Sequence, residues 1–217
     1  MLRAAPYLLL LALPAAAAAR AEDLQVDPDA GNNSLAAVFD ARLGERITAV
    51  SSAVGCDLHL DPRAEAVSGR CSVPLVSIRV DNDDTKSDHF RQWATNKKSD
   101  PAACLLEANL EGVHVGALVP GQPVAFRAEI PFRVCGRGRV DGGREQVSGT
   151  ALLFPPGAYG ERETIRIRAT VAGFDREAYQ IGPQFTEGWL ARVQALAKVV
   201  AGKGDVELSL FARPKSP

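Results

Sequence analysis

The most constraining feature of this sequence is an alternation of apolar and charged side chains with a period of two residues. In residues 123–135 the apolar side chains share one face, whereas Arg127, Glu129 and Arg133 share the other. Residues 164–174 repeat this pattern. A period of two is typical of antiparallel strands with one buried and one solvated face. The pattern therefore predicts a β-sheet around a single apolar interior.

Other β-like segments, each bounded by turn residues, occupy most of the remaining chain. They are residues 34–41, 46–55 continuing into 56–60, 71–80, 104–110, 147–154 and 205–212. With the two alternating stretches they indicate an all-β fold of about eight antiparallel strands, which is typical of a sandwich or a barrel. Residues 86–94 are expected to form a short helix. Residues 186–200 are expected to form a longer one, because Trp189, Val193, Leu196 and Val200 recur on one face.

The first 21 residues have the pattern of a secretory signal peptide, with a basic residue, an apolar run and a small-x-small site at 19–21. The apolar run is shorter than the ~20 residues that a membrane span needs, and no later stretch approaches that length. We therefore expect cleavage after Ala21, a single domain over residues 22–217, no integral membrane segment after cleavage, and a periplasmic or secreted location.

The expected mature chain is mildly acidic. Cleavage would remove Arg3 and Arg20, which leaves 23 Lys and Arg against 26 Asp and Glu, a net charge of −3. This balance and the lack of a basic block argue against nucleic-acid binding. The sequence carries no information on the oligomeric state.

All four cysteines lie in the expected mature chain: Cys56, Cys71, Cys104 and Cys135. An even number in an exported protein favours disulfides, and the lack of a C-x-x-C motif argues against a zinc knuckle or a thioredoxin-type centre. Each preferred pair, 56–71 and 104–135, flanks a turn. For the second pair, a ladder shifted by one residue would set Leu106 opposite Val134 and match the apolar faces better, with a bulge to reconcile the two. The other two connectivities remain open.

No motif in the sequence assembles a catalytic or metal-binding set. The three histidines lack the H-x-H or H-x-x-x-H spacing of metal ligands, and no G-x-S-x-G is present. The Gly-rich residues 135–143 follow a strand instead of opening a helix, which argues against a phosphate-binding loop. We therefore expect no enzymatic activity and no metal.

The segment TKSDHFRQW, residues 85–93, is the strongest remaining candidate for chemistry. Its Asp88 and His89 are adjacent, and neighbours at i and i+1 do not face each other on a helix. We interpret the segment as a helical cap that Asp84 or Thr85 begins. Its aromatic side chains would turn into the barrel mouth, and Asp88 would pair with Arg91 on the rim. A secreted hydrolase built around His89 and Asp88 is the competing interpretation.

Several short motifs, spread over nearly the whole expected mature chain, resemble the YceI-like family of exported lipid-binding proteins. They are VDPDAGNNSL at 26–35, CDLHLDP at 56–62, SIRVDNDDTKSDHFRQW at 77–93, FDREAYQI at 174–181 and GKGDVELSLFA at 202–212. The sequence departs from the family where an Arg-Asp pair is replaced by Ser87-Asp88 and His89 follows the Asp directly. The family's central motif, G-d-L-t-l-h-G-v, is reduced here to PFRVCGRGR at residues 131–139. The four cysteines are not a general family trait.

The resemblance implies an eight-stranded antiparallel, lipocalin-like barrel that holds a polyisoprenoid or quinone-type lipid, with no other cofactor. Such a barrel can enclose one apolar ligand. The predicted lining residues are Val76, Ile78, Phe90, Trp93, Phe126, Ile130, Phe132, Ile165, Ile167 and Phe174. The expected function is therefore non-enzymatic lipid binding after export. The alternative is a disulfide-stapled structural or protein-interaction module with a filled core and no ligand.

Overall fold

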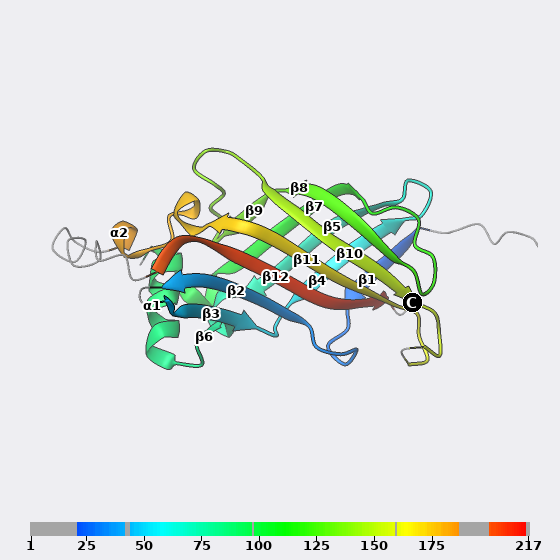
Figure 1. Ribbon diagram of the computed structural model, residues 1–217, viewed down its shortest axis with the longest axis horizontal. Helices are drawn as coiled ribbons and strands as arrows, with labels where there is room; N and C mark the ends of the chain where they lie inside the picture. The colour runs from blue at the N-terminus through cyan, green and yellow to red at the C-terminus, as the bar shows by residue number, and fades with distance from the viewer. Residues whose placement is uncertain (1–20, 42–43, 97, 159, 187–199, 216–217) are drawn as a thin grey trace, which may run out of the picture.

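A computed structural model of the protein describes residues 21–41, 44–96, 98–158, 160–186 and 200–215. In these residues nearly all regular structure is antiparallel β-sheet, with helices α1 and α2 at the same end of the molecule (Figure 1). The strands are β1 (Glu22–Val26), β2 (Ser34–Ala41), β3 (Arg46–Ser51), β4 (Gly55–Asp61), β5 (Ala66–Pro74), β6 (Arg79–Val80), β7 (Leu105–His114), β8 (Pro123–Ile130), β9 (Phe132–Val134), β10 (Glu145–Phe154), β11 (Thr164–Asp175) and β12 (Val200–Pro214). The helices are α1 (Asp84–Thr95) and α2 (Pro183–Thr186), with 3-10 turns η2 (Leu75–Ser77), η3 (Pro101–Ala103) and η4 (Arg176–Tyr179).

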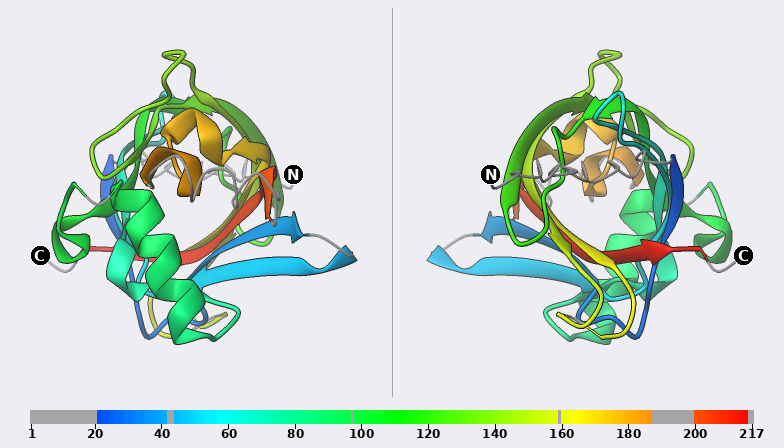
Figure 2. Two further views of the ribbon diagram at one scale, coloured as in Figure 1. Left: turned by 90° about the vertical axis from the view of Figure 1, so that its left-hand side faces the viewer. Right: turned by 90° about the vertical axis from the view of Figure 1, so that its right-hand side faces the viewer.

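The sheet curves round a central axis, so that the strands form a ring when viewed end-on (Figure 2). Its hydrogen-bonded order is β6-β3-β2-β12-β1-β4-β5-β7-β9, and a branch from β12 continues through β11 and β10 to β8. β8 and β9 are consecutive in the chain, yet β8 pairs with β10 and β9 pairs with β7. The apolar side chains of the alternating stretches lie inside this curve and form the core.

The predicted all-β, antiparallel architecture is confirmed, but the closed barrel of eight strands is not. The described residues form a sheet of twelve strands whose ladders leave the order open. Three predicted strands are each broken in two: 46–60 at Ser52–Val54, 71–80 at the turn η2, and 123–135 at Pro131. Proline has no N–H to donate to a ladder, which explains the break at Pro131. Strand β1, which lies directly after the predicted cleavage site, was not expected.

Both preferred disulfides are present. Cys56 and Cys71 are directly opposite each other in the β4–β5 ladder. The Cys104–Cys135 bond lies beside a β7–β9 ladder in the shifted register, with Leu106 opposite Val134. The disulfide and the shifted register are compatible because the backbone of Cys135 has a φ of 49°, which turns the chain out of the strand.

Helix α1 confirms the predicted short helix, but a different residue begins it. Asp83, not Asp84 or Thr85, is the N-cap, and its carboxylate accepts a hydrogen bond of 2.9 Å from the backbone N–H of Lys86. The predicted longer helix, 186–200, falls mostly on residues 187–199, which lie outside the described residues. At its ends, Thr186 closes α2 and Val200 begins β12. None of the helices in the described part of the chain has both the length and the apolar character to cross a membrane.

Candidate ligand-binding interior

Among the described residues, three apolar cavities lie in a row inside the sheet. The end cavity, of about 190 Å³, lies beside α1. The middle cavity, of about 130 Å³, follows it, and a far cavity of about 40 Å³ lies beyond. The end and middle cavities share five lining residues: Leu35, Leu106, Phe132, Phe174 and Val206. The middle and far cavities share four others: Leu58, Leu110, Phe126 and Ile167. The shared walls make the three cavities parts of one apolar interior.

Aromatic rings separate the end cavity from the middle cavity. Phe132 and Phe174 line both, with ring centroids 5.6 Å apart in an edge-to-face arrangement. Tyr179, which is fully buried, packs on both: its ring stacks on Phe174 at 5.1 Å and meets the edge of Phe132 at 5.6 Å. We call Phe132, Phe174 and Tyr179 the aromatic partition.

A β-bulge directs Phe174 into the interior. Along β11 and β12, Val171 pairs with Val206, but Phe174 pairs with Gly204, so β11 has one residue more than β12 between these points. The extra residue reverses the alternation, and Phe174 instead of Gly173 faces inward. Gly173, with a φ of 69°, donates its N–H to Asp205 at 2.9 Å and fixes the bulge.

Phe126 depends on a glycine in the neighbouring strand. Gly149 of β10 lies directly opposite Phe126 of β8. A Cβ at position 149 would lie 2.5 Å from the Phe126 ring and 2.3 Å from the Arg168 carbonyl oxygen. The missing side chain therefore lets the ring lie against β10 and leaves the adjoining cavity space open.

Nine of the ten predicted lining residues lie on cavity walls. Ile78, Phe90 and Trp93 line the end cavity; Phe132 and Phe174 line the end and middle cavities; Phe126, Ile130 and Ile167 line the middle cavity; and Ile165 lines the far cavity. Val76 is the exception, and that prediction is wrong. Pro74 ends β5, so Val76 falls in the turn η2 and is 44% exposed. Ligand binding by the other nine stays a prediction.

Helix α1 covers the end cavity with the two aromatic residues that were predicted to do so. It is held in place by Arg91, which pairs with Asp88 at 2.7 Å and donates to the carbonyl oxygens of Val76 and Ile78. His89 stacks on Trp93 with centroids 6.3 Å apart. The Asp88–Arg91 pair is therefore the rim contact that the sequence predicts.

The other two histidines each contact one carboxylate. His59 lies 2.8 Å from Asp23, and His114 lies 3.7 Å from Glu65. Within the described ranges, His, Cys, Asp and Glu side chains form no group of three that could hold a metal ion.

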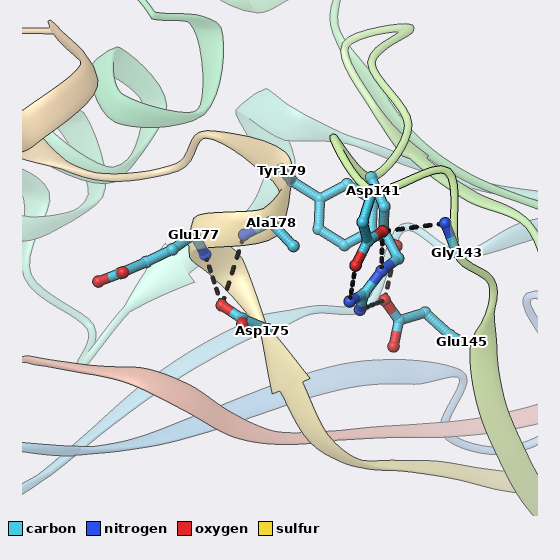
Figure 3. Close-up of polar contacts among 8 residues, drawn as sticks. Asp141, Gly143, Glu145, Asp175, Glu177, Ala178 and Tyr179 are labelled. Atoms are coloured by element: carbon cyan, nitrogen blue, oxygen red, sulfur yellow. Dashed lines mark hydrogen bonds and ion pairs between the residues drawn. The ribbon is translucent and has the colours of Figure 1, made fainter.

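A buried polar cluster adjoins the middle cavity and was missed by sequence reasoning (Figure 3). Glu145, only 6% exposed, accepts hydrogen bonds from Tyr179 at 2.7 Å and from Arg139 at 3.0 Å. Arg139 also forms two hydrogen bonds with Asp141, at 2.9 and 2.7 Å. Sequence reasoning began this strand at Val147. Glu145 shares the inward face with Val147, and this charge on an apolar face was the available signal.

Burial and hydrogen bonding shift the pKa values of Tyr179, Asp141 and Arg139 in directions that preserve these contacts, because the tyrosine stays neutral and the other two side chains stay charged. Burial, and then the hydrogen bond to Glu145, raises the pKa of the Tyr179 hydroxyl. Hydrogen bonds from Arg139 and from the Gly143 N–H hold the pKa of Asp141 well below its usual value. Hydrogen bonds with Asp141 and Glu145 raise the pKa of Arg139. The loop before β10 is thereby fastened to η4.

Comparison with known proteins shows similarity at the level of the fold. No protein-family model and no curated protein matches the sequence. Among solved structures, a polyisoprenoid-binding domain from Saccharophagus degradans implicated in plant cell wall breakdown is similar, with a TM-score of 0.59 and 12% sequence identity. The match covers 88% of this chain and 98% of that one. At this identity the similarity supports a shared lipocalin-like fold.

Proposed function

We propose that this protein is an exported, non-enzymatic binding protein that holds a long-chain isoprenoid or similar lipid inside its sheet. The observation that carries the proposal is the row of three apolar cavities enclosed by the inward faces of the strands. Each methylene buried there contributes ~0.8 kcal/mol, so a long tail can bind with few polar contacts.

The size of the cavities determines how such a ligand would fit. The end and middle cavities have volumes of about 190 and 130 Å³, whereas small-molecule pockets usually begin at ~300 Å³. A long chain must therefore occupy both, and the rings of Phe132 and Phe174 must turn aside to let it pass. On this proposal the Phe132 and Phe174 rings of the aromatic partition are the movable part of the binding site.

The function also requires a continuous wall. We propose that the sheet acts as an eight-stranded barrel in which β1 with β2, β3 with β4, β5 with β6, and β8 with β9 each serve as one long strand. The chain itself links the ladder on β7 to the ladder on β10 through β9 and β8. The fold of the polyisoprenoid-binding domain supports this arrangement.

Export to the periplasm or beyond is the proposed location. The N-terminal pattern supports it, and so do the two disulfides, because such bonds persist in oxidising compartments. We propose that residues 22–217 act as one domain after cleavage.

The test is native mass spectrometry and lipid extraction of the protein purified from the envelope of its own organism. A reproducible adduct of lipid mass is expected, and organic extraction should remove it. Reproducibly empty protein, with no uptake of added isoprenoid, would instead favour the disulfide-stapled module with a filled core. Hydrolytic activity lost in His89→Ala would favour the enzymatic interpretation.

A further inference from the structure

One oxygen atom in the wall of the middle cavity lacks a hydrogen-bond donor. Glu145 lines that otherwise apolar cavity, and its Oε1 accepts both hydrogen bonds, from the Tyr179 hydroxyl and from Arg139. Its Oε2 has no donor among the described residues, and Figure 3 shows it turned away from the dashed contacts. Glu145 as a whole is only 6% exposed, so a carboxylate oxygen that lacks a donor at this cavity wall is costly.

The charges around Glu145 decide which ligand group could bind there. Arg139 is shared between two carboxylates, Glu145 and Asp141, so the three side chains carry a net negative charge. Its Nε and Nη2 bond Asp141 and its Nη1 bonds Glu145. The neighbouring turn carries Asp175 and Glu177 (Figure 3) against one cation, Arg176, which lies 3.7 Å from Glu177, so the turn adds a further net negative charge. A phosphate or carboxylate head group at this point would be repelled, whereas a neutral donor would be attracted.

We propose that Oε2 of Glu145 accepts a hydrogen bond from a hydroxyl or N–H group of the bound lipid. The ligand class is then a long-chain alcohol, phenol or amide, and not a bare hydrocarbon, an ether or a phosphorylated lipid. This inference rests on the proposed function, since it requires a lipid in the middle cavity.

The experiment compares two probes with the same tail, geranylgeraniol and its methyl ether, which lacks the donor. Their dissociation constants are measured by competition against a fluorescent lipid. The full chain should bind the alcohol about tenfold or more tightly than the ether, the range expected for a hydrogen bond to a charged group. Equal affinities would overturn the inference and leave the proposed function standing. Failure of both probes to bind would overturn both.

Two variants make the test specific. Glu145→Gln replaces the charged acceptor by an amide that can also donate. The ratio of the dissociation constants of the ether and the alcohol should therefore fall towards one. Glu129→Gln makes the same change on the exposed outer face of β8, where Glu129 accepts a hydrogen bond from Gln146, and should keep the full preference. A Glu145→Gln variant that retains the preference would contradict the proposal. If that variant does not fold, the ratio in the unmodified protein decides.

Discussion

The middle and end cavities are walled by different kinds of structure. The middle cavity is enclosed mainly by strands β5, β7, β8, β10, β11 and β12, with Leu35 of β2 and Leu58 of β4, and these side chains are fixed by ladder register. The end cavity is enclosed partly by α1 and by the β2–β3 pair, which reaches out beyond the ring of strands (Figure 2). Helix α1 is attached through side chains such as Arg91 and Ser87. A wall held by side chains can yield more easily than one held by ladder hydrogen bonds, so we expect a ligand to enter at the end cavity and to be selected in the middle one.

Removing the ring that separates the cavities should have the largest effect. Phe174→Ala deletes a ring that is 7% exposed and lines both cavities. We expect a loss of about 3–5 kcal/mol in the free energy of unfolding, measured in urea, because the deletion leaves a void. At the same time, the preference for longer isoprenoid chains should rise, because the two cavities join.

Phe174→Leu is the control for that variant, since it keeps a bulky apolar side chain at the partition. It should lose less stability and keep the chain-length preference of the unmodified protein. If Phe174→Ala binds long and short chains in the unmodified ratio, the partition does not separate the two regions.

Removing one disulfide at a time should destabilise the wall of the middle cavity and the wall of the end cavity separately. Cys71 lines the middle cavity, whereas the Cys135 sulfur lies 3.4 Å from the Ala94 carbonyl oxygen at the end of α1. The bonds close loops of 15 and 31 residues. Replacing either pair by serines should therefore cost about 3 kcal/mol of unfolding free energy through the unfolded chain.

Local hydrogen exchange should distinguish the two disulfide variants. Loss of the Cys104–Cys135 bond should speed exchange in residues 84–95, whereas loss of the Cys56–Cys71 bond should leave these amides protected. Equal acceleration of α1 in both variants would show that the two regions are not independent.

Local sequence patterns could predict the strands and the disulfides because each depends on alternation and turns near the residues concerned. Cys56 and Cys71 flank one turn, and the apolar match of Leu106 with Val134 identified the second register. Strand breaks were harder to predict, because a strand such as β6 exists only through its partner β3. Pro131 was a visible signal for one of these breaks.

The site was predictable where its residues belong to alternating strands or, like Phe90 and Trp93, to the predicted short helix α1. Phe174 was identified although a bulge reverses the alternation just before it, and Val76 was misplaced because the turn η2 interrupts its strand. Glu145 contacts Arg139, which lies in the loop before β10, and Tyr179, which is 34 residues further along the chain. No periodicity encodes such contacts, so the polar cluster required the structure.

Filling the cavities one at a time compares their roles in binding. Ala169→Phe fills the middle cavity and Ala49→Phe fills the end cavity. Displacing about three methylenes from a fixed wall should weaken geranylgeraniol binding about 50-fold, at ~0.8 kcal/mol each. Ala49→Phe should weaken it less, because the wall beside α1 can move.

Ala125→Phe is the matched control, since Ala125 is exposed on the outer face of β8. It should leave the dissociation constant unchanged. Should Ala49→Phe weaken binding as much as Ala169→Phe, the end cavity would be as rigid as the middle one, and the proposed difference between them would be wrong.

The smallest expected effect concerns the helix that covers the end cavity. Asp83→Ala removes the N-cap of α1 and should cost about 1 kcal/mol of unfolding free energy. Asp84→Ala, one residue further on, removes only an exposed pair with Arg79 and should cost less than about 0.5 kcal/mol. If α1 controls entry, only Asp83→Ala should speed both association and release of lipid in stopped-flow measurements, with little change in the dissociation constant. This follows because fraying of the helix changes the barrier to entry but not the contacts of the bound chain in the middle cavity. Identical rates in the two variants would show that the ligand enters the interior by another route.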